Sequence, residues 1–508
     1  MIPLLIGVTS YLTAGILSLT FHRFRRPFSF LGWVGGTAGL SIAVASYFNS
    51  GSAVTHLGNW GRLGIELKLD QITVLFAGLA VVLNVIALIY LSSDEEKEAT
   101  FYGLFNFLFA TAFSLAFSHD LFNIYVTIEL MSLISILLIG YERETYGIYA
   151  GIKYLLLSSL AMSLYLIGLG IIYMNGGSLG IEELASTLAR GGEFSTLLGV
   201  GLLATGLAVK GGVLLFSMWL PDAYTYSGTV VSALLAGIAT KFGLVGIVRL
   251  SEIGGIGTPL LIIGGLTGLG GAGFALISQI PKKILAYSTI SQVGLILIGV
   301  SSGTRLGVTA AALHLFFHGL LKALLFLSIG HAGVGKRDMF IKGGSPLPLA
   351  SKLGLVVGSL SVMGVVPFNG FFSKEVLHNS LPGASWYLVL GISVLTAAYY
   401  LRLGYALLRQ DTGREFAQSD FLLILFALLV AFSGGVVFVV PGPERFVELL
   451  EFRDVITSVG VVLVGGLFLA GIWKPLKEID PPAFIFNLDN SLVSVFTGFL
   501  LIALFLFL

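Results

Sequence analysis

Residues 306–331 read LGVTAAALHLFFHGLLKALLFLSIGH, an apolar run long enough to cross a lipid bilayer as one helix. Three ionisable side chains interrupt this run: His314, His318 and Lys322 are spaced four residues apart and therefore stack on one helical face. Ionisable groups at membrane depth are costly, and they normally face a protein interior or a water-filled cavity. This stretch therefore predicts a membrane helix within a bundle whose interior carries charge.

Runs of the same kind, about 18 to 25 residues each, follow one another along almost the whole chain. Hydrophobic residues make up 56% of the 508 residues and charged residues only 11%, whereas a soluble domain carries about 25% charged residues. We find no alternating strand-like segments, so helices rather than a barrel are expected to satisfy the backbone. The sequence predicts an all-α polytopic membrane protein with about 14–16 transmembrane helices.

The expected spans follow directly from the apolar runs. The first has no basic stretch ahead of it and no small-residue cleavage site, so we interpret it as a retained helix rather than a signal peptide. Outside the spans, residues 181–190 alternate apolar and polar side chains at helical spacing and are expected to lie on the surface. Sixteen spans are expected near residues 2–20, 28–48, 70–91, 101–118, 120–140, 148–174, 196–217, 229–250, 256–280, 284–301, 306–331, 353–378, 385–408, 421–441, 455–473 and 491–508.

The loop charges predict an orientation. With the N-terminus outside, fifteen Lys and Arg residues fall in inner loops and seven in outer loops. This bias agrees with the positive-inside rule over the whole chain. We therefore expect a multi-pass protein of the cell (plasma) membrane with both termini outside.

Composition excludes several kinds of chemistry. The chain has no cysteine, so it holds no disulfide, no thiolate-bound zinc and no cysteine-ligated iron–sulfur cluster. A net charge of +1 gives no sign of a nucleic-acid partner. The glycine-rich run 268–273 lies inside a membrane span with no strand before it, so a nucleotide loop is not expected there. We predict that the chain itself binds no cofactor.

Charged residues nevertheless occur within the spans. Each costs about 2.5–3.5 kcal/mol at the centre of a membrane helix, and such residues usually mark an ion pathway. A static buried ion pair that fixes helix register is the alternative, but the lysines outnumber the intramembrane acids, Glu129 and Glu375. Lysines in a low dielectric can exchange protons near neutral pH. The basic residues within spans are Lys153, Lys210, Lys241, Lys322, Lys374 and Arg402.

Three interpretations remain open for His314 and His318. The pair could bind a metal, but a third ligand is missing from their helix and Lys322 beside them would repel a cation. Packed core histidines are a second interpretation. A proton relay is the one that we favour, since histidine changes its charge near neutral pH.

Two interruptions of hydrophobic spans suggest an internal repeat. Gly211-Gly212 follows Lys210 directly, and Pro367 to Gly370 precede Lys374. Paired breaks of this kind are typical of inverted repeats whose broken helices line an ion site. We therefore predict two inverted five-helix units with the seventh and twelfth spans broken. The predicted organisation is N-terminal helices over 1–100, repeat units over 101–250 and 256–408, and C-terminal helices over 421–508.

Several motifs, in order, resemble a known family: the antiporter-like membrane subunits of respiratory complex I, of Mrp sodium/proton antiporters and of archaeal membrane-bound hydrogenase and sulfane-reductase complexes. The resemblance covers about residues 65–410. Its matching stretches are Lys153-Tyr-Leu-Leu-Leu, Lys210 followed by Trp219-Leu-Pro-Asp-Ala, Val231-Ser-Ala-Leu-Leu-Ala-Gly with Lys241 and Arg249, Lys283-Ile-Leu-Ala-Tyr-Ser-Thr-Ile-Ser-Gln-Val-Gly, His318 to Lys322, and Pro367-Phe-Asn-Gly-Phe-Phe-Ser-Lys374-Glu375.

The resemblance implies roles for individual residues. It implies a glutamate–lysine pair, Glu129 with Lys210, and a bridging lysine, Lys241. A histidine/lysine helix and an ionisable residue on the broken twelfth span, Lys374, would complete a proton wire. The chain departs from the family at two positions where proline and histidine are usual, which read Leu215 and Ser217. Proton entry near Lys210 is therefore in doubt, and water or Tyr224 and Tyr226 are the substitutes that we consider.

The leading functional prediction is an ion-translocating subunit, for H⁺, Na⁺ or both, of a larger membrane complex that is either redox-driven or of Mrp type. Its partners would be other membrane subunits, with a peripheral redox arm in the redox-driven case. The alternatives are a stand-alone secondary transporter of a solute coupled to protons, and a scaffold with vestigial charges. The connection 474–490 is too short for the long membrane-parallel helix of some relatives.

Overall fold

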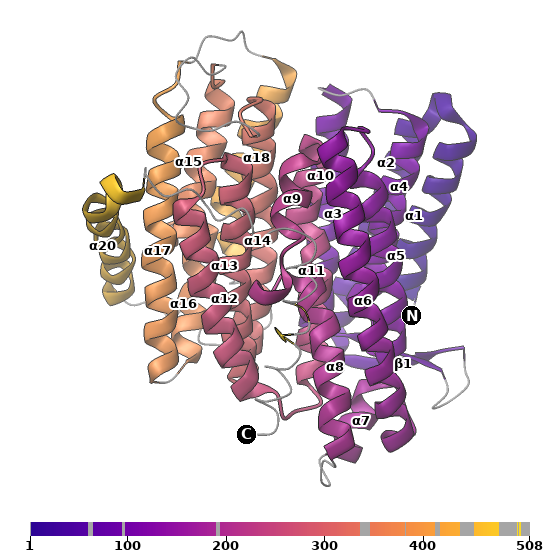
Figure 1. Ribbon diagram of the computed structural model, residues 1–508. Helices are drawn as coiled ribbons and strands as arrows, with labels where there is room; N and C mark the ends of the chain where they lie inside the picture. Colours follow the sequence, from indigo (N-terminus) through magenta and orange to yellow (C-terminus); the bar gives the residue numbers. More distant parts are fainter. Residues whose placement is uncertain are drawn as a thin grey trace. The chain divides into compact units, whose positions relative to one another are not determined.

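Apolar helices make up nearly all of the protein. The computed structural model describes residues 2–58, 64–93, 97–188, 194–335, 346–381, 383–411, 417–436, 452–476, 495, 497 and 498. Within them, 14 helices are long and apolar enough to cross a membrane (Figure 1). Side chains such as Ile16, Leu137 and Leu467 are exposed on outward helix faces, as expected for surfaces that contact lipid. The predicted all-α polytopic fold is confirmed.

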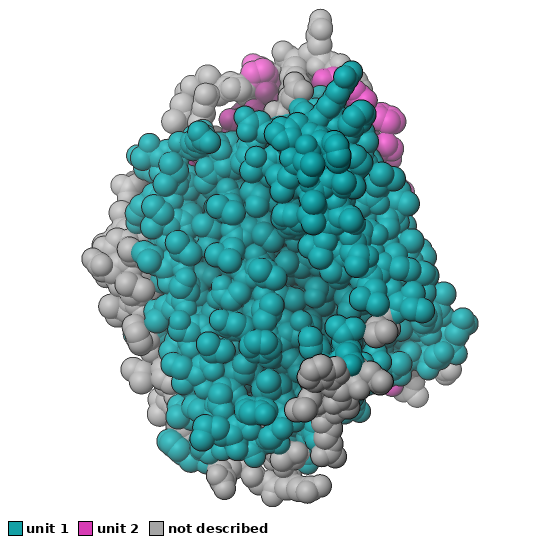
Figure 2. Space-filling model, turned by 90° about the vertical axis from the view of Figure 1, so that its right-hand side faces the viewer, with its two compact units in different colours: residues 1–211, 238–259, 491–508 teal, residues 212–237, 260–490 magenta. Residues whose placement is uncertain are grey.

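The chain divides into two compact units, which Figure 2 distinguishes by colour. The first unit holds the described parts of residues 1–211 and 238–259, and the second those of 212–237 and 260–490. The first contains α1 (Ile2–Thr20), η1 (His22–Phe24), α2 (Arg25–Ser50), β1 (Ala53–Leu57), β2 (Ile65–Leu69), α3 (Gln71–Ser93), α4 (Ala99–Phe117), α5 (Leu121–Ile139), α6 (Thr145–Gly176), α7 (Ile181–Leu188), α8 (Phe194–Gly211) and α11 (Thr240–Ser251).

The second unit is also helical. Its elements are η3 (Leu214–Phe216), α9 (Leu220–Tyr226), α10 (Thr229–Leu234), most of α12 (Gly257–Ile277), α13 (Pro281–Ser301), α14 (Arg305–His331), α15 (Leu349–Met363), α16 (Asn369–Ser380), α17 (Ala384–Leu407), α18 (Gln418–Phe432), η5 (Ser433–Gly435) and α20 (Phe452–Leu476). A π-helical turn, η4 (Leu235–Ala239), joins α10 to α11. The run from Thr229 to Ser251 therefore reads as one span.

The expected spans correspond closely to these helices. Fourteen of the sixteen appear as single spans. The twelfth, expected over 353–378, is divided into α15 and α16. The sixteenth, 491–508, lies outside the described residues except for 495, 497 and 498, and the connection 477–490 lies outside them too. The predicted surface helix over 181–190 is present as α7, whose Ile181 and Leu184 are buried.

The structure also contains one short hairpin that the sequence did not indicate. β1 and β2 pair as an antiparallel hairpin in the loop before α3, with Val54 opposite Lys68 and His56 opposite Glu66. Each strand has only five residues, and β1 is mostly exposed, so neither shows the long hydrophobic alternation that identifies a strand in a sequence. The rest of the described chain is helical or irregular apart from two isolated bridges.

Both predicted helix breaks are present, and the second lies earlier than expected. α8 ends at Gly211, and Gly212 adopts a positive φ of 74°, which glycine tolerates at no steric cost. The second break was expected at Pro367 to Gly370, but it covers 364–368, and α16 begins at Asn369. Gly364 makes that turn with a φ of 83°. Gly370 is needed for a different reason, because a Cβ on it would lie 1.8 Å from the carbonyl oxygen of Ser361.

Glycines elsewhere bring helix backbones into contact. In the first unit, a Cβ on Gly243 of α11 would lie 2.2 Å from the backbone nitrogen of Gly211 in α8. In the second, a Cβ on Gly294 of α13 would lie 2.3 Å from the nitrogen of Gly268 in α12. Membrane helices associate through small residues because lipid offers them no hydrophobic driving force. These contacts hold each unit together.

We predict that Gly243→Ala destabilises the protein by about 1–3 kcal/mol, because the added methyl group clashes with backbone that cannot move independently. The matched control is Gly273→Ala in α12, where a Cβ meets nothing within 4 Å. This control should be neutral or slightly stabilising, because alanine favours helix. Thermal unfolding of the two purified variants in detergent checks the prediction, and equal unfolding temperatures would contradict it.

Candidate functional site

Lys210 occupies the last turn of α8 and is completely buried. Its ammonium group donates hydrogen bonds to the hydroxyl groups of Ser132 on α5 and Ser158 on α6. It also lies 5.8 Å from the centre of the Tyr154 ring, within cation–π range. Among the described residues, no carboxylate lies within 4.0 Å of it. Neutral hydroxyl groups, not a direct ion pair, therefore solvate this charge.

Glu129 lies on α5, three residues before Ser132, and is half-buried. It interacts electrostatically with Lys210, and with Tyr125 and Tyr154. The two charges are thus near each other without direct contact. The glutamate–lysine pairing stays a prediction, and water would have to complete it. Lys153, the predicted site lysine of α6, is also buried.

Lys241 is completely buried in the first turn of α11, directly after the π-helical turn. Its ammonium group is 3.4 Å from the Thr240 hydroxyl. A π turn leaves backbone carbonyls without their usual helical partner. One of them, the carbonyl of Leu235, accepts a hydrogen bond of 2.8 Å from the hydroxyl group of Tyr224 in the second unit's α9 segment. Tyr224 therefore stabilises the irregular turn. Its suggested part in proton entry stays a prediction.

In the second unit, Lys322 on α14 has surroundings similar to those of Lys210 in the first unit. Its ammonium group donates to the Ser288 hydroxyl, to the Leu285 carbonyl at 2.9 Å and to the Tyr400 hydroxyl at 3.2 Å. The Tyr400 ring lies 5.8 Å away. Each unit thus surrounds a buried lysine with serine hydroxyls and the face of a tyrosine ring.

His314 and His318 stack with ring centres 6.0 Å apart, as their spacing predicts. Nδ1 of His314 lies 3.0 Å from the hydroxyl group of Ser373 on α16, the residue before Lys374. The described residues contain no cluster of three or more His, Asp or Glu side chains able to hold a metal ion. The geometry places α14 beside the broken helix and leaves the relay role a prediction.

Lys374 points back toward the break that precedes its helix. It is 5% exposed, and its Nζ lies 3.5 Å from the carbonyl oxygen of Met363, the last residue of α15. That carbonyl has no partner within its own helix, because the helix ends there. Glu375 is buried too and interacts with Asp454 of α20. Sequence reasoning did not single out Asp454, because it lies at the start of a separate span.

Comparison with known proteins identifies the family. Residues 118–399, more than half of the chain, match the model for the transmembrane region of NADH:quinone oxidoreductase/Mrp antiporter proteins. The chain belongs to this family. It is 32% identical over 364 residues to NADH-quinone oxidoreductase subunit N of Desulforudis audaxviator, covering 67% of this chain and 72% of the relative. It is 30% identical to the D subunit of the Na(+)/H(+) antiporter of Alkalihalophilus pseudofirmus, covering 74% and 78%.

Two solved structures share the fold of this antiporter-like subunit. A chain of the membrane-bound sulfane sulfur reductase, an archaeal respiratory membrane complex, superposes with a TM-score of 0.76 at 24% identity, covering 92% of this chain and 99% of that chain. A chain of the Mrp complex from Dietzia sp. DQ12-45-1b gives 0.72 at 21% identity, covering 98% and 97%. At these identities the likeness concerns the fold. The predicted family resemblance is confirmed. The prediction of partner membrane subunits is supported as well, because both solved structures are multisubunit membrane complexes.

This family member also carries a buried charge cluster that sequence reasoning missed. His119, between α4 and α5, contacts Glu66 of β2 through Nδ1 and Glu252 through Nε2, the latter at 3.0 Å. Lys68 lies 3.2 Å from the same Nε2 and forms an ion pair with Glu252. The only available signal was a set of single charged residues in separate loops, and nothing in the sequence brings those loops together.

Arg249 extends the cluster to Asp70. Arg249 lies in the last turn of α11, is completely buried and donates to both carboxylate oxygens of Asp70. Burial alone would raise the pKa of Asp70, but the Arg249 guanidinium outweighs it and lowers that pKa. Burial likewise opposes a low pKa at Glu252, but its hydrogen bond to His119 and the nearby charges lower that pKa well below its usual value. The same balance lowers the pKa of Glu66.

Two other buried basic residues stabilise helix ends. Arg402 donates to the carbonyl groups of Leu276 and Ser278 where α12 ends, the second at 2.7 Å. Lys282, predicted in a loop, is buried in α13 and donates at 2.9 Å to the Ser227 carbonyl and to the Ser232 hydroxyl. Such carbonyl groups lack partners within their own helix or turn. Both residues therefore have structural contacts that account for them.

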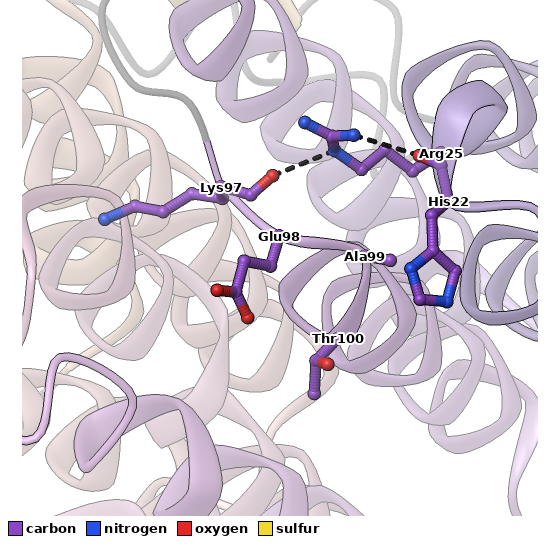
Figure 3. Close-up of a pocket in the computed structure, with 6 residues that line it drawn as sticks. All are labelled: His22, Arg25, Lys97, Glu98, Ala99 and Thr100. Atoms are coloured by element: carbon purple, nitrogen blue, oxygen red, sulfur yellow. Dashed lines mark hydrogen bonds between the residues drawn. The ribbon is translucent and has the colours of Figure 1, made fainter.

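A pocket of about 370 Å³ lies in the first unit away from the predicted ion-site residues (Figure 3). His22, Arg25 and residues 97–100 line it. The Arg25 side chain crosses this pocket, donating at 2.9 Å to the carbonyl groups of Lys97 and His22. Since none of the predicted ion-site residues lines it, we assign the pocket no part in translocation.

The charge cluster predicts a pH-dependent stability. The pKa values of Glu66, Asp70 and Glu252 are lower in the folded chain than in the unfolded chain. Their stabilisation is therefore complete above about pH 4–5 and is lost as the pH falls through the folded values. Glu252→Gln should cost about 1–3 kcal/mol at pH 7, and its difference from the wild type should shrink as the pH falls.

Thermal unfolding in detergent between pH 7 and pH 2 measures this effect, because the loss begins only below the unfolded pKa values. Glu144→Gln, which removes an exposed acid before α6, is the matched control and should follow the wild type. A Glu252→Gln variant whose deficit stays constant across the range would show that the carboxylate charge does not stabilise the cluster.

Proposed function

We propose that this chain is the ion-translocating subunit of a multisubunit membrane complex and moves protons through buried ionisable side chains. The observation that carries the proposal is the Lys210 ammonium, completely buried and held by the hydroxyl groups of Ser132 and Ser158. The residues proposed to take part are Glu129, Lys153, Lys210 and Lys241 in the first unit and His314, His318, Lys322, Lys374 and Glu375 in the second.

A lysine held in this way can lose its proton without leaving a buried counter-charge unpaired. Breaking a direct buried ion pair costs about 3–5 kcal/mol, because the remaining partner stays charged in a low dielectric. Serine hydroxyls avoid that cost, because each can donate to a neutral amine or accept from an ammonium group. Glu129, which acts on Lys210 electrostatically from a short distance, can bias this equilibrium without preventing proton release.

The second unit supports the same chemistry at Lys322. Ser288 and the Tyr400 hydroxyl, like the serines around Lys210, can serve as donors or acceptors. Serine and tyrosine groups thus recur around a buried lysine in both units. A static register-fixing charge needs no such repeated set of reversible partners.

Membership of the family supports a complex rather than a lone transporter. Relatives at about 30% identity are named as subunits, of an NADH-quinone oxidoreductase in one case and of an Na(+)/H(+) antiporter in another. We therefore propose a redox-driven or Mrp-type assembly in the cell membrane, with both termini outside and, in the redox-driven case, a peripheral arm that supplies the electron chemistry. The subunits that co-purify with this chain distinguish the two assemblies.

We predict that Lys241→Met abolishes coupled ion movement while the complex still assembles, because a hydrophobic side chain of similar length replaces a buried charge at little cost to the helix. Lys241→Arg should also fail. Arginine keeps the charge but does not release its proton near neutral pH. Proton uptake by liposomes that contain the purified complex, followed with a pH-sensitive dye, measures both variants.

Lys97→Gln is the control, because Lys97 forms an ion pair with Glu142 near the helix ends and outside the proposed pathway. It should pump at the wild-type rate. Lys241→Met pumping normally would refute the pathway, whereas a working Lys241→Arg would show that only the charge is required. Repeating the assay with Na⁺ gradients decides between proton and sodium movement.

A further inference from the structure

One face of α20 packs against other helices of the second unit, and the opposite face is exposed. The packed face carries residues at helical spacing: Asp454, Ser458, Val461, Gly465 and Leu469. Apart from Gly465, each of these residues is at most 8% exposed. The large side chains exposed on the opposite face are apolar, namely Ile456, Val459, Leu463, Val464, Leu467 and Phe468. An acidic residue on a membrane helix is costly unless it has a partner. Asp454 therefore lies on the one face where the protein can provide that partner.

The packed face of α20 meets the break between α15 and α16. The hydroxyl group of Ser458 donates at 2.7 Å to the carbonyl of Gly364, the residue at which that break turns. Further along, a Cβ on Gly465 would lie 2.7 Å from both the Cβ of Ala397 and the carbonyl oxygen of Val394, so α20 and α17 are in backbone contact (Figure 1). These contacts fix Asp454 in position relative to α16.

Asp454 and Glu375 bring two buried carboxyl groups within interaction range of each other. Two ionised carboxylates at such a range repel each other, and one proton held between them removes that repulsion. Asp454 is 3% exposed, and Glu375 is 8% exposed. Arg453 and His378 interact electrostatically with the pair, and Lys374 interacts with His378. Arg453 lies 3.6 Å from Asp454, but its side chain is 72% exposed, which weakens its influence on the pair.

His378 connects the pair to Lys374. It lies one helical turn after Lys374 on α16, and it interacts electrostatically with both Lys374 and Asp454. Its Nδ1 atom is buried and has no hydrogen-bond partner among the described residues. A buried ring nitrogen without a partner is costly unless a proton or a water molecule visits it. This nitrogen lies between a proton donor and a carboxyl pair.

We propose that Asp454 and Glu375 share one exchangeable proton and together form the last proton-holding site of the second unit. In the release step the O–H bond of the protonated carboxyl group breaks, the proton passes to water on the predicted outer side, and two carboxylates remain. In the loading step an N–H bond of the Lys374 ammonium breaks, His378 relays the proton, and a new carboxyl O–H bond forms. The repulsion between the two carboxylates favours loading. The inference rests on the proposed function and adds a residue of α20 to its pathway.

A purely structural carboxyl pair that only anchors α20 is the competing explanation. Both explanations predict that removing Asp454 weakens α20 packing, so stability alone does not separate them. Proton transfer by a positioned side chain contributes about 10²–10⁴ to a rate, and an anchor contributes nothing to the pH profile. The test must therefore measure translocation and protonation together.

Asp454→Asn keeps the shape of the side chain but removes the exchangeable proton. In the reconstituted complex it should slow proton translocation about tenfold or more and alter its pH profile. Asp454→Glu, which restores a carboxyl group, should recover much of the rate. The double variant Asp454→Asn with Glu375→Gln should be no slower than either single variant, because the two residues act as one unit. Thr457→Ala, on the exposed side of the same helix, is the matched control.

Infrared spectroscopy provides a readout that needs no variant to pump. The wild-type complex should show the C=O stretch of a protonated carboxyl group at neutral pH, shifted in D₂O and lost or displaced in Asp454→Asn. Wild-type translocation by Asp454→Asn, or absence of that band in the wild type, would overturn the proposal. If Lys241→Met stops pumping while Asp454→Asn does not, only this inference is wrong. If Lys241→Met pumps normally, the proposed function itself is wrong.

Discussion

An ammonium group buried among helices requires hydrogen-bond acceptors, and this requirement shapes both units of the protein. Around Lys210 the acceptors are the hydroxyl groups of Ser132 and Ser158, which lie on two different helices. Helices α5, α6 and α8 must therefore pack closely enough for three short side chains to meet. Around Lys322 the same requirement brings α13 and α17 to α14 through Ser288 and Tyr400. The helix packing and the chemistry of the buried charge are thus one constraint.

The fold was largely predictable because membrane helices are specified by local sequence. Fourteen spans correspond to apolar runs, and the glycine pair after Lys210 correctly predicts the end of α8. The second break was misplaced by a few residues, because Gly370 looks like a turn residue but serves to let Ser361 approach. The β1–β2 hairpin was missed because its pairing is non-local and its strands are short and mostly polar.

The individual site residues were also visible in the sequence, because a lysine within an apolar run is conspicuous. Their partners were not. Serine and tyrosine residues are unremarkable in a membrane helix, so nothing marks Ser158 as a ligand of Lys210 until α6 and α8 are packed. Asp454 and the cluster around His119 depend on contacts between segments far apart in the chain, with Glu66 and Glu252 separated from His119 by 53 and 133 residues. Such contacts follow from tertiary packing, which periodicity does not report.

The glycine contacts have a consequence for how fast the interior of each unit can respond. Where Gly243 meets Gly211, and where Gly294 meets Gly268, backbone lies directly on backbone, with no layer of side chains over which one helix could slide past the next. Rocking of helices against each other, which usually takes microseconds to milliseconds, is therefore opposed at these crossings. Side chains around them remain able to change rotamer on a picosecond-to-nanosecond scale. Within each unit, a long lysine side chain changing rotamer is consequently the fastest element that can carry a charge from one partner to another.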